Sequence, residues 1–243
     1  SGEYYFDTID FDPGPGVFNM TAPYAQSYFL KLDPQGNFIW TKQIGSYPPI
    51  EDYYVTCRDI YATSDGDLFI TGDFEGEGPI DFDPNAGIDT VTSSTIFSQN
   101  FVAKWDSAGN LLWKSIVNGV LNSQMAITEL NSGNVFFTGT YYSNIYLANL
   151  DSTGALLFYD DFANKDPYVD TDERDNIYLS GLYNLITDFD WTTGNYSLIP
   201  STPADFFIAK YSKTKPVCSV SPTAIFANAV GNTICSGQNI ALS

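Results

Sequence analysis

Histidine is absent from the 243 residues, and basic residues are few: ten Lys and Arg stand against 29 Asp and Glu, giving a net charge of −19. Without an imidazole, Ser-His-Asp catalysis, Cys-His catalysis and His-ligated zinc are excluded. Ten basic residues cannot form the positive surface that nucleic-acid binding needs. An anionic membrane surface repels such a chain, and no apolar run approaches the roughly 20 residues of a membrane-spanning helix. Nucleic acid and direct membrane insertion are therefore excluded.

Cysteine is also scarce, and its three positions do not form a zinc pattern. Cys57 stands alone in a strand-like run. Cys218 and Cys235 could form a disulfide only if the fold brings them together, and two buried apolar thiols are an equal alternative.

Aromatic residues are abundant, at 16%, and they recur in a repeated unit. This unit is an apolar run, a turn that begins with Asp and contains Gly, and a second apolar run; it occurs at 28–40, 101–113 and 145–158. Gly supplies a left-handed turn residue and Asp can bond the backbone of the turn, so each copy predicts a β-hairpin. A fourth copy starts at 206–212, where no Gly turn or second apolar run follows.

A second unit lies between these hairpins, at 67–74, 134–141 and 176–183. Each copy follows a short turn and is preceded by another short strand, at 58–63, 124–130 and 168–171. A Gly inside each copy indicates a bulge or a close backbone approach. Four short antiparallel strands per repeat, without helical periodicity, predict the blade of a β-propeller.

The first four residues match the end of a second strand, so we expect the sequence to open inside a blade. About three and a half blades then fit into residues 1–212, whereas known propellers close with roughly four to eight. The prediction is an all-β, incomplete propeller, an excised segment of a larger chain. Its open blade ends would be covered by the rest of that chain or by a protein partner.

The repeat resembles the Bacteroidota beta-propeller repeat family, often called SBBP repeats. The resemblance rests on Phe-Asp-Pro-Gly-Pro-Gly at 11–16, the strand at 28–33, and Gly-Asn-Phe-Ile-Trp-Thr-Lys at 36–42. It implies a secreted or surface-displayed propeller and no enzymatic activity. Residues 213–243 change character, and Cys-Ser-Gly-Gln-Asn-Ile-Ala-Leu at 235–242 resembles the first strands of an Ig-like surface-protein module. We therefore expect a linker and an incomplete Ig-like segment there.

An acidic loop recurs three times as Asp-Phe-Asp followed four residues later by Gly. Calcium takes six to eight oxygen ligands, which alternating carboxylates and loop carbonyls can supply. The alternative is a structural turn in which Asp caps backbone NH groups and Phe anchors the loop. The candidate metal ligands are Asp10, Asp12, Asp81, Asp83, Asp188 and Asp190.

Trp40, Trp113 and Phe158 occupy equal positions in their repeats. They could be sugar-stacking platforms, but packing between blades is the favoured interpretation because large aromatics dominate burial. The predicted function is a non-enzymatic secreted or cell-surface scaffold or binding segment, such as a glycan- or protein-binding adhesin. The rival is a carbohydrate-active enzyme with a carboxylate pair, since that chemistry needs no histidine.

Overall fold

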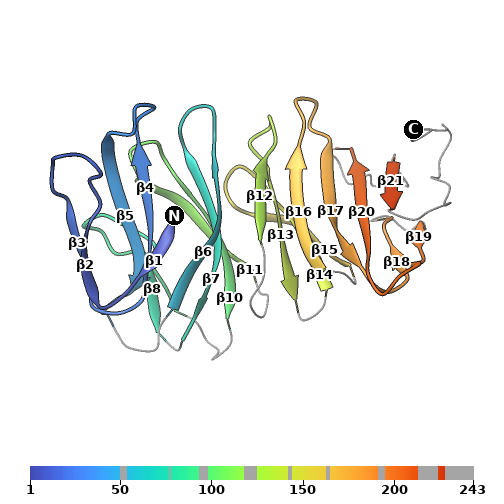
Figure 1. The fold of residues 1–243 in the computed structure, drawn as a ribbon, viewed down its shortest axis with the longest axis horizontal. Helices are drawn as coiled ribbons and strands as arrows, with labels where there is room; N and C mark the ends of the chain where they lie inside the picture. Colours follow the sequence, from blue (N-terminus) through green and yellow to red (C-terminus); the bar gives the residue numbers. More distant parts are fainter. Residues whose placement is uncertain are drawn as a thin grey trace. The chain divides into compact units, whose positions relative to one another are not determined.

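The structure is a computed structural model that describes residues 1–49, 54–76, 78–92, 98–117, 125–141, 144–162, 165–190, 195–212 and 224–227. The chain divides into two units, Ser1–Asn122 and Ser123–Ser243. Throughout the described ranges the secondary structure is strand and turn, without a helix, and all strand pairs are antiparallel (Figure 1). None of these residues forms a helix that could cross a membrane. The all-β prediction is confirmed.

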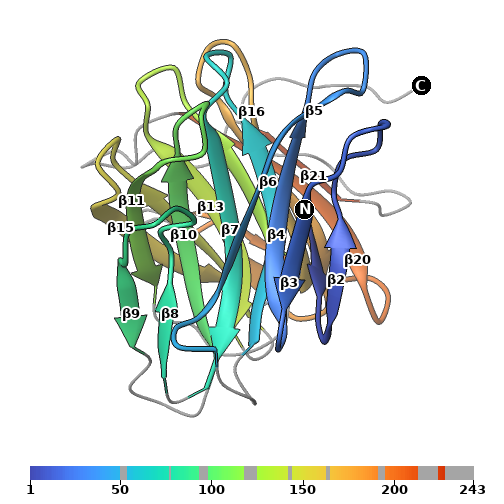
Figure 2. The same ribbon diagram turned by 90° about the vertical axis from the view of Figure 1, so that its left-hand side faces the viewer.

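The first unit contains two sheets and a separate hairpin (Figure 2). The first sheet has the order β1-β4-β5-β8-β9, formed by Gly2–Tyr4, Gln26–Leu32, Phe38–Ser46, Pro79–Asp81 and Thr90–Thr92. The second has the order β6-β7-β10-β11, formed by Tyr54–Ala62, Leu68–Glu75, Gln99–Trp105 and Leu111–Val117. The separate hairpin pairs β2 with β3, Asp7–Asp10 with Asn19–Ala22.

The second unit repeats the four-stranded pattern twice. The third sheet has the order β12-β13-β14-β15, formed by Ala126–Glu129, Val135–Tyr141, Asn144–Leu150 and Leu156–Phe162. The fourth has the order β16-β17-β20-β21, formed by Lys165–Thr171, Ile177–Tyr183, Asp205–Tyr211 and Ala224–Ala227. A short hairpin pairs β18 with β19, Thr187–Asp188 with Ser197–Leu198. These four-stranded antiparallel sheets agree with the predicted blade.

The register of the strands confirms that residues 1–4 are equivalent to a second strand. A glycine lies opposite an aromatic residue in all four sheets, in the pairs Gly2–Tyr28, Gly72–Phe101, Gly139–Tyr146 and Gly181–Phe207. A Cβ on Gly139 would lie 2.2 Å from the Tyr146 hydroxyl oxygen, and one on Gly72 would lie 2.8 Å from the Phe101 ring. The strand glycines at these two positions therefore mark close approaches, as predicted.

One five-residue turn closes six of the strand pairs, at 33–37, 63–67, 106–110, 130–134, 151–155 and 172–176. In each, the NH of the first residue donates to the carbonyl of the fifth, and the NH of the fourth donates to the carbonyl of the first. The fourth residue is a glycine with φ between 81° and 86° in five turns, and Asp175 with φ 60° in the sixth. The left-handed turn residue predicted from the repeats is therefore present, and Asp replaces Gly once.

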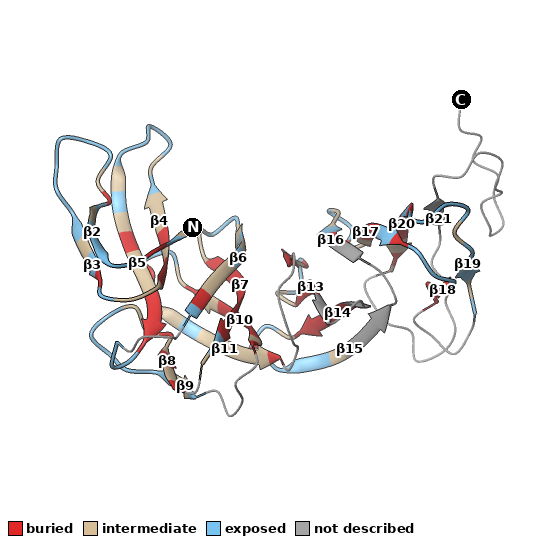
Figure 3. Cartoon of the chain, turned by 60° about the horizontal axis from the view of Figure 1, so that its bottom comes forward, coloured by how far each residue is buried: buried red, intermediate tan, exposed pale blue. Residues whose placement is uncertain are grey.

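Each unit has its own aromatic core. In the first unit, Phe29 and Ile44 of the first sheet pack with Phe74, Phe101 and Trp105 of the second. In the second unit, Phe136 and Leu147 of the third sheet pack with residues of the fourth. Buried residues follow β7 and β10, whereas β2 and β3 are mostly exposed (Figure 3). Apolar burial between neighbouring sheets is the main stabilising contribution.

The equivalent aromatics each contact another aromatic ring of their own sheet. Trp40 contacts Phe29 with ring centroids 5.8 Å apart, and Trp113 contacts Phe69 at the same separation. Phe158 contacts Phe136, with ring centroids 5.6 Å apart. These contacts lie within single sheets, so they show ring packing between strands and leave the predicted packing between blades untested by these pairs.

Residues 224–227 correct one expectation. The sequence places this range in the linker and Ig-like segment, and it shows no second apolar run directly after 206–212. Instead, β21 pairs with β20, for example Ile225 with Ala209, and adds a fourth strand to the fourth sheet. The unpaired backbone groups at the edge of β20 can form hydrogen bonds with any adjacent strand, whether a long connection or a tight turn precedes that strand. The rest of 213–243, with Cys218 and Cys235, lies outside the described residues.

Candidate functional site

The three acidic loops are the turns of hairpins β2–β3, β8–β9 and β18–β19, which we call the acidic hairpins. Their first carboxylates do the same work: Oδ1 of Asp10 accepts from the backbone NH groups of Asp12 (3.1 Å) and Phe18 (2.8 Å). Oδ1 of Asp81 accepts from Asp83 (3.0 Å) and Asp89 (2.9 Å). Oδ1 of Asp188 repeats the pattern with Asp190 and Tyr196, at 3.0 and 2.7 Å. Each carboxylate thus joins the two arms of its loop.

The second carboxylate closes the turn. Oδ1 of Asp12 accepts from the NH of Gly14 (2.8 Å), and Oδ1 of Asp83 from the NH of Asn85 (2.9 Å). The second oxygen of this carboxylate lies beside the glycine that ends the motif: a Cβ on Gly87 would lie 2.0 Å from Asp83 Oδ2. Gly16 stands in the same relation to Asp12, at 2.1 Å. A side chain at this glycine would displace the carboxylate, so the glycine lets the carboxylate keep this position.

These contacts favour the structural turn over the calcium site. Within the described ranges, no three acidic or cysteine side chains converge closely enough to hold a metal ion. The described hydrogen bonds of Asp10, Asp12, Asp81 and Asp83 go to backbone NH groups. Residues 191–194, which complete the third loop beyond Asp190, lie outside the described part. Calcium binding stays a prediction.

The second acidic hairpin also extends the first sheet. β8 pairs with β5 through Gly45–Asp81 and Ser46–Ile80, and the Tyr47 NH donates to the Pro79 carbonyl (2.9 Å). This hairpin lies between β7 and β10 in the sequence, yet it joins the sheet that precedes its own. It thereby brings Asp81 and Asp83 next to the end of β5.

A hollow of about 370 Å³ lies beside the loop of this hairpin and the ends of β3, β4 and β5. Its walls come from the end of β3, from β4 and β5, from the segment after β5, and from the β8–β9 loop. The lining residues are mostly uncharged: Thr21, Pro23, Gln26, Gln43, Gly45, Ser46, Tyr47, Pro49, Asp81, Asp83, Pro84, Asn85, Ala86, Gly87 and Ile88. All of them belong to the first unit.

Gln26 is the most deeply buried amide of the hollow. The residue is only 4% exposed, and its side-chain amide lies against Gly45, where a Cβ would fall 1.9 Å from Oε1 and 2.3 Å from Nε2. No described residue forms a hydrogen bond with this amide. The residue lines the hollow, so its amide is open to that space and can form hydrogen bonds with a molecule there.

Gln43 contributes a second amide, and its orientation is held by the core. Its Oε1 accepts a hydrogen bond from the Tyr4 hydroxyl. Burial raises the pKa of Tyr4 to about 12, so the phenol keeps its proton at neutral pH. Because Oε1 is used, the NH₂ group remains to donate to another molecule.

Two exposed apolar side chains and one fixed amide complete the lining. Tyr47 is 45% exposed and Ile88 is 59% exposed. Asn85 is held by Lys42, whose Nζ donates to Asn85 Oδ1 (2.6 Å). The hollow thus combines amide donors and acceptors, two carboxylates and an apolar surface.

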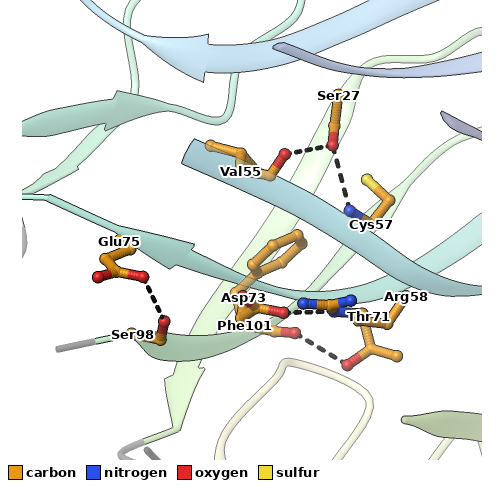
Figure 4. A network of polar contacts seen from close by, with 9 residues as sticks. All are labelled: Ser27, Val55, Cys57, Arg58, Thr71, Asp73, Glu75, Ser98 and Phe101. Carbon is orange, nitrogen blue, oxygen red and sulfur yellow. Dashed lines mark hydrogen bonds and ion pairs between the residues drawn. The ribbon is translucent and has the colours of Figure 1, made fainter. Parts of the chain in front are cut away.

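A polar network elsewhere in the unit has a structural role (Figure 4). The Ser27 hydroxyl donates to the Val55 carbonyl (2.5 Å) and accepts from the Cys57 NH (3.1 Å), which joins β4 to β6. Arg58 pairs with Asp73, with 2.6 Å between Nε and Oδ1. These groups bond each other, so they do not point to a ligand. Burial also raises the pKa of the Cys57 thiol to about 12.

The carboxylates of the five-residue turns have lowered pKa values because of hydrogen bonds. In Asp106 the largest cause is the backbone NH of Asn110, and in Asp172 it is the side-chain amide of Asn176. Asp33 and Asp151 are lowered by their own turns in the same way. A general acid needs a raised pKa, so these four groups act as anionic acceptors within turns.

The sequence indicated only part of this site. It singled out Asp81 and Asp83, but it missed Gln26, Gln43 and Tyr47. Gln26 recurs as Gln99 at the same place in the second sheet, opposite Tyr4 and Phe74 respectively. A repeated residue suggests a structural role, and nothing local distinguishes the copy that lines a hollow.

Comparisons with known proteins identify no family. No protein-family model and no curated protein match the chain. A solved structure from Bacteroides ovatus ATCC 8483, provisionally assigned as a hydrolase, is 10% identical, with a TM-score of 0.30. The match covers 69% of this chain and 43% of that one, less than half its length. A protein of unknown function from Bacteroides caccae is also 10% identical, with a TM-score of 0.29, and the match covers 73% of this chain and 76% of that one.

Proposed function

We propose that this chain is a non-enzymatic binding and scaffold segment of a larger secreted or cell-surface protein, and that its ligand is a glycan. The observation that carries the proposal is the hollow of the first unit. Its lining offers amides, hydroxyls and carboxylate oxygens beside an exposed tyrosine. Hydroxyl-rich ligands need such paired donors and acceptors, together with an apolar surface for the sugar ring.

The rival activity, glycoside hydrolysis, needs two carboxyls of different protonation on opposite sides of the scissile bond. Asp81 and Asp83 are the two carboxylates of the hollow. Both lie on one loop, and Oδ1 of each accepts backbone NH groups of that loop. This arrangement supports binding, because both carboxylates are engaged in holding the loop.

A glycan array probed with the whole chain tests the proposal. We expect reproducible binding to a subset of neutral glycans. The same glycans are then incubated with the chain, and newly formed reducing ends are measured. Release of reducing ends above a buffer control would replace the binding proposal with the enzyme. An array without any bound glycan would remove glycan as the ligand.

An additional protein-contact role is supported by exposed aromatics near the N-terminus. Tyr5 is 62% and Phe6 is 68% exposed; the two rings contact each other, and Phe6 also contacts Tyr24. Exposed apolar clusters often mark protein contacts. Light scattering tests this role: the wild-type chain should associate with itself, and Tyr5→Ser with Phe6→Ser should reduce the association. A monodisperse wild-type monomer would contradict it.

A further inference from the structure

We infer that the hollow binds one uncharged sugar ring and that Gln26 is the residue that recognises it. The inference rests on the proposed function and goes further, because it names the site, the chemical class and the deciding residue. It starts from Gln26, a residue that is 4% exposed, lines the hollow, and whose amide forms no hydrogen bond with a described residue. Such an amide is stabilised when a ligand supplies a donor and an acceptor together.

Two vicinal hydroxyls of a sugar meet that requirement. One hydroxyl can donate to Oε1 of Gln26 while its neighbour accepts from Nε2, and both atoms lie against Gly45 at the wall of the hollow. Gln43 adds a donor, because its Oε1 is already bonded to Tyr4. Gly45 is essential to this geometry, since any Cβ there would occupy the position of the Gln26 amide.

The charge of the hollow selects against anions. Asp81 and Asp83 stand on one wall, and the protein as a whole carries a net charge of −19. The described lining contains no Lys or Arg, and the two lysines that contact the β8–β9 loop are engaged, Lys42 with Asn85 and Lys114 with Asp89. A uronate or a phosphate would meet repulsion here, whereas neutral hydroxyls can donate to the carboxylates.

Size and surface agree with a single ring. Small-molecule sites range over roughly 300–1,000 Å³, and the hollow of about 370 Å³ lies at the small end. Tyr47, at 45% exposure, supplies a partly open aromatic side chain for the apolar face of a sugar. A longer glycan would place its other units in solvent.

Titration calorimetry with the whole chain tests the inference. The probes are the methyl glycosides of glucose, galactose and mannose, N-acetylglucosamine, glucuronate as the anionic comparator, and calcium chloride. We expect at least one neutral probe to bind and glucuronate to bind more weakly by about tenfold or more. Gln26→Leu should weaken binding by about tenfold or more, because two hydrogen bonds are lost.

The matched control is Gln99→Leu, which changes the equivalent glutamine of the second sheet, outside the hollow. It should leave the affinity unchanged. Thermal unfolding separates recognition from structure: Gln26→Leu should not lower the melting temperature, since the amide forms no hydrogen bond with a described residue that the substitution would remove. If Gln26→Leu fails to fold, that outcome itself contradicts the inference, and Tyr47→Ala at the exposed mouth still reports whether the hollow binds sugar.

The other outcomes distinguish this inference from the proposed function. Sugar binding that Gln26→Leu and Tyr47→Ala leave intact would place the site elsewhere and overturn the inference alone. Absence of neutral-probe binding, with hits on the glycan array, would also overturn only the single-ring site. An empty array would overturn both. Calcium binding lost in Asp81→Asn, without sugar binding, would make the hollow a cation site.

Discussion

The strand glycines give the sharpest stability prediction, and Gly72→Ala is the most informative change. Gly72 lies on β7 between Cys57 of β6 and Phe101 of β10. A Cβ there would fall 2.1 Å from the backbone carbonyl oxygen of Thr56 and 2.8 Å from the Phe101 ring. Non-bonded atoms prefer roughly 3.5–4.0 Å. Because the closest atom belongs to the backbone, a rotamer change cannot remove this steric clash, and β6 must move away from β7.

The magnitude follows from that geometry. Overpacking a core costs typically about 1–3 kcal/mol, and a backbone obstacle belongs at the upper end. The lower chain entropy of unfolded Ala returns about 0.4–1 kcal/mol. We expect a net loss of about 2–2.5 kcal/mol in the free energy of unfolding. For a unit of this size the melting temperature should fall by about 10 °C.

Urea unfolding followed by tryptophan fluorescence is the assay. Trp40, Trp105 and Trp113, three of the four tryptophans, lie in the unit that contains Gly72. The control is Gly36→Asn, because nothing lies within 4 Å of a Cβ at Gly36 and Asn tolerates its φ of +86°. A loss below about 0.5 kcal/mol for Gly72→Ala, similar to the control, would refute the pairing of β6, β7 and β10.

Three further predictions concern titration, metal and thiol chemistry. Folding lowers the pKa of Asp172, so the stability that Asp172 contributes is present above its unfolded pKa of about 3.9 and is lost as pH falls through the lower folded value. The midpoint of urea unfolding should therefore be constant above about pH 5 and fall in acid. In Asp172→Asn the fall in acid should be less steep. An equally steep acid loss in that variant would contradict the turn bonds. Because the acidic hairpins use their carboxylates on backbone NH groups, chelator should leave the melting temperature unchanged, and a rise with added calcium would restore the metal alternative. The Cys57 thiol is partly exposed but its pKa is raised to about 12 by burial, so in a chain carrying Cys218→Ser and Cys235→Ser it should react with a disulfide reagent more slowly in the native than in the denatured protein at neutral pH; equal rates would contradict the raised pKa.

Local patterns predicted the repeated elements well. Asp and Gly spacing predicted turns such as 33–37 and 106–110, and the Gly inside each second strand predicted the close approaches at Gly72 and Gly139. These features depend on neighbours in sequence or on the adjacent strand, so they leave a local signal. The repeats also placed residues 1–4 correctly in a second strand.

Long-range pairing could not be predicted in the same way. Nothing in β8 indicates that it joins β5 of the preceding sheet, because strand edges accept many partners and the hydrogen bonds carry no side-chain signature. The hollow exists only because of that pairing. The amide of Gln26 is therefore distinguished from that of Gln99 by its surroundings alone. The same reasoning explains why the sequence places β21 in the wrong segment.

The central claim is that the hollow recognises a neutral sugar through Gln26. The most direct measurement is the side-chain amide spectrum of the ¹⁵N-labelled chain during titration with the methyl glycosides, with the Gln26 and Gln43 signals assigned from their Leu variants. The account predicts that the Gln26 NH₂ signals shift with saturation while those of Gln99 stay in place. Saturable shifts that leave Gln26 and Gln43 unchanged, or no saturable shift with any neutral glycoside, would contradict it.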